Sequence, residues 1–212
     1  MLILDEKHLF IHMHKCAGTS VCRAIIDQVE PERVEFFGYT VEGEQRSATS
    51  KRNGSVWKHS TAQRVRKWMG EERWANLENV VFASVRSPFD RAASFFFYAK
   101  RHNLRDKKKY PMIADSSFTD FIFEHQYPKD TIHSFVESGD GTCLVNHFLK
   151  FDDIENSFNQ LCEEIGIGQF DLPTLNANPS VVNYDFMYGR RERMLIAKMF
   201  RREIKDYFPE LV

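Results

Sequence analysis

One stretch near the start of the chain, residues 9–20, constrains the fold more than any other part of the sequence. It reads Leu-Phe-Ile-His-Met-His-Lys-Cys-Ala-Gly-Thr-Ser, an apolar run followed by small and hydroxyl-bearing residues. The next residues, 21–26, have the apolar spacing of an amphipathic helix. The pattern predicts a buried strand, a tight loop and a helix.

The predicted loop has the chemistry of an anion site. Gly18 lets the backbone approach a ligand closely, and the first N–H groups of a helix lack intrahelical partners. Lys15 adds a point charge, and Thr19 and Ser20 add hydroxyl donors. The lysine precedes the glycine here, whereas in the familiar phosphate loop it stands directly before the Ser or Thr. The alternative is a plain turn in which Thr19 or Ser20 caps the helix.

A second strand-to-helix turn carries another candidate anion site. Residues 80–85 are apolar enough for a fully buried strand, and Ser87 and Pro88 follow as an N-cap and a first helical residue. Arg86 stands at the entrance of this helix, and Ser94 lies two turns into it. A guanidinium and a hydroxyl together suit a terminal phosphate monoester. The two turns predict one ligand with two separated phosphate groups.

Both motifs resemble those of sulfotransferases that use 3′-phosphoadenosine 5′-phosphosulfate (PAPS). Residues 14–20 resemble the 5′-phosphosulfate loop, and residues 86–94 resemble the 3′-phosphate motif R-x-P-x-x-R-x-x-S. Cys16 and Ala17 replace a more usual Thr-Gly pair, and both are small enough to be tolerated. The chain is most similar to the branch of carbohydrate O-sulfotransferases and their bacterial relatives. The resemblance continues through residues 58–62, 172–176 and 206–208.

The resemblance implies roles for individual residues. His59, in the Lys-His block, is expected to take the proton from the acceptor hydroxyl, because a neutral imidazole with a pKa of roughly 6.5 is available near pH 7. Lys15 would stabilise charge on the departing adenosine 3′,5′-bisphosphate (PAP), and no metal is required. Asn176 and Asn178 lie in a loop that would close over the nucleotide. The residues expected to bind the nucleotide are Lys15, Cys16, Ala17, Gly18, Thr19, Ser20, Arg86 and Ser94.

The alternative for His59 is a structural role, because a lone histidine is more often a packing residue than a base. The residues around it predict a short strand at 56–59 and a capping box at 60–63 that opens a helix. Ligands of open α/β sheets bind at the carboxyl ends of strands, so we expect His59 on the rim that carries both anion sites. Among the other histidines, His14 ranks second because it borders the loop.

The chain of 212 residues is expected to form a single α/β domain over 1–212, with the three layers and mostly parallel sheet of P-loop nucleotide-binding proteins. A formal net charge of -1 does not favour nucleic acid as a partner. The four cysteines form no C-x-x-C pair, and no run approaches the roughly 20 apolar residues of a membrane span. These features, and the lack of a recognisable signal peptide, favour a soluble, cytoplasmic protein over one whose membrane anchor is not part of the given sequence.

Other segments have weaker patterns. Residues 34–39 are predicted as a strand, residues 42–55 as an exposed loop, and residues 153–165 as a helix that ends at Gly166. The chain is predicted to finish with one long helix whose apolar stripe lies in the core. That stripe contains Met194, Leu195, Met199, Phe200, Ile204 and Tyr207.

The sequence also predicts the class of acceptor, and it leaves two alternative functions open. The expected acceptor is a hydroxyl-bearing carbohydrate, and Lys107, Lys108 and Lys109 either steer an anionic one or belong to a solvated loop. One rival is a P-loop kinase that uses ATP and magnesium; against it, Arg86 stands where a magnesium-binding acid is expected. The other rival is a non-catalytic glycan- or nucleic-acid-binding protein, which leaves His59 unexplained.

Overall fold

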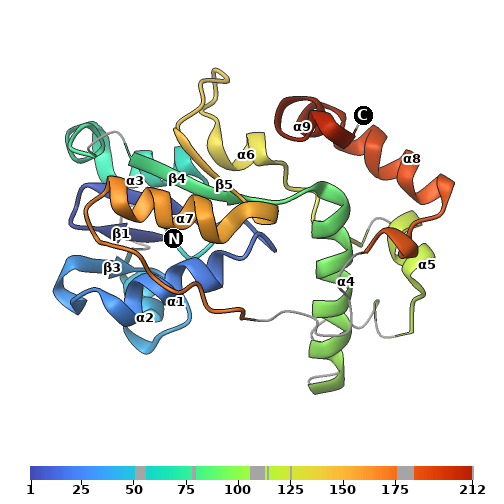
Figure 1. The fold of residues 1–212 in the computed structure, drawn as a ribbon, viewed down its shortest axis with the longest axis horizontal. Helices are drawn as coiled ribbons and strands as arrows, with labels where there is room; N and C mark the ends of the chain where they lie inside the picture. The colour runs from blue at the N-terminus through green and yellow to red at the C-terminus, as the bar shows by residue number, and fades with distance from the viewer. Residues whose placement is uncertain are drawn as a thin grey trace. The chain divides into compact units, whose positions relative to one another are not determined.

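The computed structural model describes residues 1–50, 56–77, 80–105, 113, 115–124, 126–175 and 184–211. The chain divides into two compact units, which can be followed by colour in Figure 1. Unit 1 contains Met1–Val85 and Ile132–Leu175, and unit 2 contains Arg86–Thr131 and Asn176–Val212. The expectation of a single domain over the whole chain is not tested by this division and stays a prediction.

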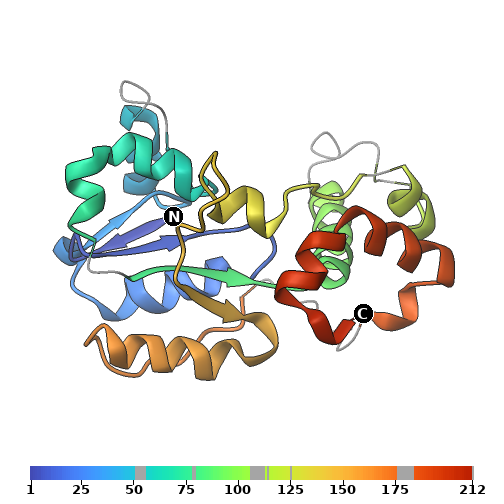
Figure 2. The same cartoon turned by 90° about the horizontal axis from the view of Figure 1, so that it is seen from above.

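A five-stranded sheet forms the centre of the described part of unit 1 (Figures 1 and 2). Residues 80–85, predicted as a fully buried strand, form a strand that is buried at every position. The strands in chain order are β1 (Leu2–Leu4), β2 (His8–Ile11), β3 (Val34–Phe36), β4 (Val80–Val85) and β5 (His147–Lys150).

The strand directions confirm a mostly parallel sheet. The order is β3-β1-β2-β4-β5, and β4 pairs in parallel with both β2 and β5. Strand β1 pairs antiparallel with β2 and with β3, so β3 runs in the same direction as β2. Four of the five strands therefore point the same way. Because Ile11 lies opposite Ala83, the carboxyl ends of β2 and β4 lie at the same edge.

Strand β1 is not predicted by the sequence pattern, because its turn lacks the usual Asn-Gly or Asp-Gly signal. The turn instead places Asp5 and Glu6 at φ values of 54° and 58°, and the N–H of Lys7 donates to the carbonyl of Leu4 at 3.0 Å. The Arg33 guanidinium donates to both carboxylate oxygens of Asp5, at 2.7 and 2.8 Å. A contact from a distant residue thus stabilises a turn that local sequence does not favour.

Helices pack on both faces of the sheet in unit 1. They are α1 (Gly18–Gln28), α2 (Val41–Thr49), α3 (Ala62–Ala75), α6 (Ile132–Val136) and α7 (Ile154–Glu164). Figure 2 shows α1 and α7 on one face and α3 on the other, which gives unit 1 the predicted three layers. Helix α7 is followed by Gly166 at a φ of 73°, which confirms the predicted end of this helix.

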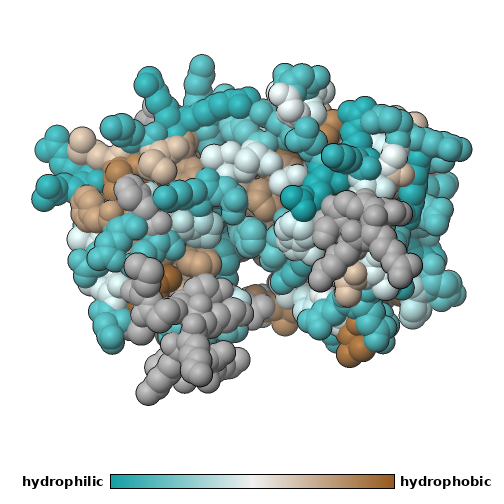
Figure 3. Space-filling view, turned by 180° about the vertical axis from the view of Figure 1, so that it is seen from behind, coloured by the Kyte–Doolittle hydropathy of each residue, from teal (hydrophilic) through white to brown (hydrophobic). Residues whose placement is uncertain are grey.

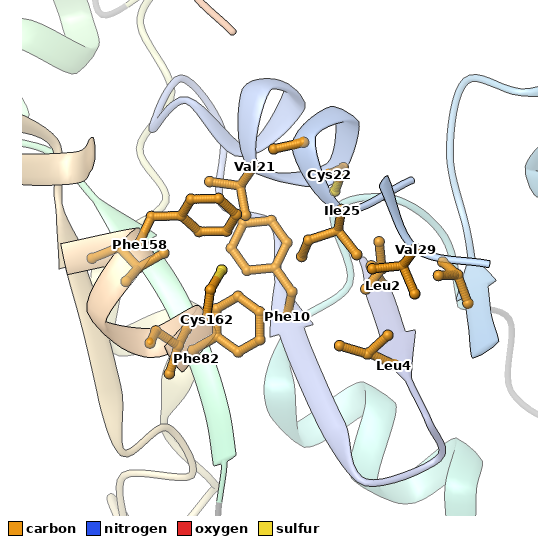
Figure 4. Packing of buried hydrophobic residues seen from close by; sticks show 14 of the residues in the cluster. Leu2, Leu4, Phe10, Val21, Cys22, Ile25, Val29, Phe82, Phe158 and Cys162 are labelled. Carbon is orange, nitrogen blue, oxygen red and sulfur yellow. The ribbon is translucent and has the colours of Figure 1, made fainter. Parts of the chain in front are cut away.

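The core between the sheet and the helices α1 and α7 fixes the position of α1 (Figure 4). Phe10 of β2 and Phe82 of β4 lie with their ring centroids 5.0 Å apart, and both are fully buried. Val21 and Ile25 of α1 and Phe158 of α7 belong to the same buried cluster. Burial of each such side chain contributes roughly 1.5–3 kcal/mol. The loop between β2 and α1 is therefore held at both ends by packed elements.

The predicted loop at residues 42–55 is wrong over most of its length, because α2 occupies residues 41–49. The hydroxyl of Thr40 caps this helix by accepting a hydrogen bond from the N–H of Gly43 at 3.0 Å. Glu42 and Glu44 lie in the first turn, where the helix dipole favours acidic side chains. These start signals outweigh the weak apolar pattern. Residues 51–55 lie outside the described residues.

The predicted strand at residues 56–59 is also wrong, because this segment enters α3 through a turn. The N–H of Ser60 donates to the carbonyl of Trp57 at 3.0 Å, and the Ser60 hydroxyl accepts from the N–H of Trp57 at 2.9 Å. Thr61, not Ser60, caps α3, and it accepts from the N–H of Arg64 at 3.3 Å. His59 therefore lies in a tight turn directly before a helix.

Unit 2 is helical in its described part, with an aromatic core. Its helices are α4 (Pro88–Arg105), α5 (Phe118–Phe123), α8 (Arg190–Met199) and α9 (Arg201–Tyr207). Ser117 and Asp120 form a capping box at the start of α5. The Phe118 ring contacts Phe96 of α4 and Tyr188, with centroid distances of 5.4 and 4.9 Å. Short 3-10 helices in the two units occupy Pro31–Arg33, Phe151–Asp153, Asp185–Met187 and Pro209–Leu211.

The predicted long C-terminal helix is interrupted. Phe200, at φ -110° and ψ 26°, separates α8 from α9. Phe200 and Ile204 are buried as predicted, whereas Met194 and Met199 are 62% and 42% exposed, so the stripe is wrong at these two positions. On the face of the molecule shown in Figure 3, hydrophobic residues occupy small, separate areas.

Candidate active site

The loop that joins β2 to α1 contains strained backbone. Lys15 and Ala17 have φ values of 62° and 59°, which lie in the left-handed region. Such a conformation costs a residue other than glycine roughly 1–2 kcal/mol. Strain of this kind concentrates at functional sites, and successive N–H groups in such turns form concave anion sites. The geometry is consistent with the predicted anion loop.

The helix start rules out the alternative in which Thr19 or Ser20 is a cap. Ala17 occupies the N-cap position, and α1 begins at Gly18, so both hydroxyls lie inside the first turn. Ser20 is buried, and its hydroxyl accepts from the N–H of Leu175 at 3.3 Å. Thr19 is half-buried. Thr19 is thus the more accessible of the two hydroxyls.

Two small residues of the loop have packing roles. The Cys16 thiol is buried and donates to the carbonyl of His14 at 3.3 Å. A Cβ atom at Gly18 would lie 2.2 Å from the His12 ring, so no other side chain fits there without displacing that ring. Glycine is required at position 18 because the His12 ring packs against its backbone. Lys15 and Ala17 are half-buried.

The structure brings His59 to this loop. Its Nδ1 lies 2.8 Å from the carbonyl oxygen of His12, the residue after β2. A carbonyl can only accept a hydrogen bond, so Nδ1 carries the proton and donates it. In a neutral ring the other nitrogen, Nε2, then has the lone pair. His59 is thereby fixed in the tautomer that can accept a proton at Nε2.

Two further histidines contact the His59 ring. His14 stacks on it with a centroid distance of 3.9 Å and an interplanar angle of 26°. The His12 ring approaches it edge-on, with a centroid distance of 4.7 Å. Phe135 of α6 packs edge-on against His14 at 5.7 Å. Because residues 12 and 14 belong to the loop that carries Lys15, the candidate base and the candidate anion site form one cluster.

Burial controls the charge of these rings. Burial, followed by the neighbouring His14, lowers the pKa of His59 to about 3, although its hydrogen bond to the His12 carbonyl acts in the opposite direction. Burial also holds the pKa of His12 well below its usual value. Both rings are therefore neutral near pH 7.

The side chain of Lys58 lies over the Tyr39 ring, 5.3 Å from its centroid, and the Tyr39 hydroxyl donates to the carbonyl of Thr19 at 3.5 Å.

The lowered pKa of His59 predicts a loss of stability in acid. The unfolded chain binds a proton at His59 near pH 6.5, whereas the folded chain binds it near pH 3, so this contribution is complete above about pH 6.5 and decreases as the pH falls toward 3. Urea unfolding at about pH 7, 5.5 and 4.5 should show a smaller decrease for His59→Asn than for the wild type. Equal decreases for the two proteins would contradict the assignment.

The predicted 3′-phosphate residues lie in unit 2. Arg86 follows the last residue of β4, and its guanidinium lies 5.4 Å from the ring centroid of Tyr184. Ser87 caps α4 by accepting from the N–H of Asp90 at 3.1 Å, which confirms the predicted helix start. Ser94 is half-buried on α4. Their role in phosphate binding stays a prediction.

The second arginine of this motif, Arg91, is a core residue. Its guanidinium donates to Glu203 of α9 at 2.5 Å and to the carbonyl of Asp130 at 2.8 Å. The side chains of Arg91 and Glu203 are 4% and 0% exposed. The guanidinium also lies 5.3 Å from the Phe200 ring centroid. In this chain Arg91 holds α4 to α9, a role that the motif alone does not reveal.

Five residues with predicted roles lie outside the described residues: Lys107, Lys108, Lys109, Asn176 and Asn178.

The four cysteines are all free thiols. Within the described ranges, no helix combines the length and the apolar character that crossing a membrane requires. In the same part of the chain, no three His, Cys, Asp or Glu side chains are grouped so that they could hold a metal ion.

Comparison with known proteins gives one match. A family model described as "Sulfotransferase family" matches residues 2–187, which is most of the chain and includes both predicted motifs. No curated protein and no solved structure matches the chain significantly. The match identifies the family of the chain and assigns no role to any single residue.

Proposed function

Because this chain belongs to the sulfotransferase family, we propose that it transfers the sulfuryl group of PAPS to a hydroxyl group of a carbohydrate. The observation that supports a base in this reaction is the hydrogen bond from His59 Nδ1 to the His12 carbonyl. This bond leaves Nε2 unprotonated in a ring that contacts the anion loop. A kinase is disfavoured because the loop lacks G-K-[ST] and because Arg86 stands where a magnesium-binding acid is expected.

His59 acts on the acceptor hydroxyl. Its Nε2 accepts the proton of the acceptor hydroxyl as the hydroxyl oxygen forms a bond to sulfur. The bond between sulfur and the bridging oxygen breaks at the same time, and PAP carries away the electron pair. Lys15 stabilises the negative charge that develops on that oxygen, and Thr19 and the first N–H groups of α1 hold the 5′-phosphate. The proton and the charge are thus received by two side chains of one cluster.

Arg86 and Ser94 are proposed to bind the 3′-phosphate, and this part rests on the sequence motif. The Tyr184 ring beside the planar guanidinium restricts its orientation, which favours paired hydrogen bonds from its N–H groups to two phosphate oxygens. The acceptor is proposed to be anionic because of the basic run at residues 107–109.

Thermal unfolding with nucleotides tests the donor. A ligand at about one hundred times its Kd adds roughly 2.7 kcal/mol, which raises the Tm of a domain of this size by several degrees. We expect this increase with PAP, a smaller one with adenosine 5′-monophosphate, and none with ATP and magnesium. An increase with ATP and magnesium alone would exclude the proposal and favour a kinase.

Two variants make this test specific for the 3′-phosphate. Arg86→Ala should remove the difference between PAP and adenosine 5′-monophosphate, because the lost guanidinium contacts only the 3′-phosphate. Arg190→Ala, an exposed position on α8, is the control and should keep the wild-type response. An unchanged PAP response in Arg86→Ala would exclude Arg86 from the site.

A further inference from the structure

His14 has no part in the proposed reaction, yet it makes the closest ring contact with the proposed base. Its ring lies between two others, stacked on His59 at 3.9 Å and packed edge-on against Phe135 at 5.7 Å. His14 is half-buried and directly precedes Lys15. The position of the ring is therefore set by packing on one side and by the candidate base on the other.

A ring stacked in this way can act on its neighbour by two physical effects. It covers one face of the His59 imidazole, and together with the bond from Nδ1 to the His12 carbonyl it limits rotation of that ring. It also disfavours a positive charge on His59, because after burial this neighbour is the next cause of the lowered pKa of His59.

We propose that His14 is a positioning residue for His59, which holds the plane of the base by stacking on its ring. This inference rests on the proposed function, because it assigns His14 a role only through the base.

The other charged or titratable groups that face His59 do not replace His14. They are His12 at the end of β2, Lys58 in the same turn and the amino group of Met1, which donates to the Lys58 carbonyl at 2.6 Å. His12 is buried and meets the ring at its edge. Of these groups, His14 is the one that lies flat against the ring.

Two substitutions separate the two effects. His14→Phe keeps a flat ring on His59 and removes the imidazole nitrogen atoms, whereas His14→Ala removes the whole ring. His147→Phe, a half-exposed histidine on β5, is the matched control. The first measurement is an NMR titration of the His59 imidazole without nucleotide, which requires no enzymatic activity.

In His14→Phe we expect the pKa of His59 to be higher than in the wild type, because a neighbour that lowers it is gone. In His14→Ala we expect kcat to fall about tenfold or more with little change in the KM for PAPS, because the base is less well oriented. His14→Phe should retain most of kcat, and its pH profile should follow the shifted titration. His147→Phe should leave both unchanged.

An identical His59 titration in the wild type and in both His14 variants would overturn the proposal. A shifted titration in a protein that shows no sulfuryl transfer from PAPS would support the effect of His14 on His59 and exclude the proposed function. The two failures are therefore distinguishable.

Discussion

Replacement of His59 by alanine is expected to lower kcat by about a hundredfold or more, the usual effect of removing a general base. The reason lies in the fixed tautomer: Nδ1 is occupied by the His12 carbonyl, so the lone pair at Nε2 is the group that can receive the proton. Binding of PAP should persist, because the proposed contacts of His59 are with the acceptor. Steady-state kinetics with PAPS, combined with PAP binding by calorimetry, measure the two effects.

A second variant separates the base from the scaffold. His59→Asn keeps an N–H donor that can reach the His12 carbonyl and removes Nε2, so it should lose as much activity as His59→Ala while retaining more stability. His147→Ala, a half-exposed position outside the cluster, should have near-normal activity. Turnover close to wild type in His59→Asn would eliminate His59 as the base.

Replacement of Arg91 by alanine is expected to lower the free energy of unfolding by roughly 3–5 kcal/mol. The change leaves the Glu203 carboxylate, whose side chain is 0% exposed, without its ion-pair partner. It also removes the bond to the Asp130 carbonyl at 2.8 Å and the contact with the Phe200 ring. Urea unfolding measures the loss, which should occur without any change in the nucleotide preference of the folded protein.

The control for this prediction is an exposed ion pair. Arg202 and Asp206 lie 3.5 Å apart on α9, with side chains 64% and 40% exposed, and Arg202→Ala should cost no more than about 0.5 kcal/mol. The double variant Arg91→Met/Glu203→Leu should recover much of the loss, because no charge is then left buried. A loss below about 1 kcal/mol in Arg91→Ala would show that the pair behaves like a surface contact.

Local chemistry explains which elements the sequence could predict. Strand β4 and the start of α4 are specified by an apolar run followed by Ser87 and Pro88, and the predicted positions are confirmed. The end of α7 at Gly166 has an equally local cause. In each case the side chain that determines the boundary lies within a few residues of it.

Other elements depend on contacts with distant residues. The turn after β1 is held by Arg33, which lies 28 residues from Asp5 in the sequence. The break at Phe200 places this ring in the core of unit 2, although an unbroken helix satisfies the local pattern. Periodicity alone does not contain this information.

In the candidate site, too, local sequence predicts some features, and contacts between distant residues determine others. Residue types and motifs single out Lys15, His59 and Arg86. The tautomer of His59 could not be predicted, because its partner is a backbone carbonyl 47 residues away. The burial of Arg91 against Glu203 was equally hidden, since the two residues are 112 positions apart. The only sequence signal for His14 was its position beside the loop.

The two contacts of His12 have a consequence for engineering. Its ring occupies the space that a side chain at Gly18 would need, and its carbonyl sets the tautomer of His59. The donor loop and the acceptor base are therefore not separable modules. A redesign that reshapes residues 12–18 for another leaving group also moves the atom that orients the base. Libraries that vary this loop should vary position 59 and its supporting turn together with it.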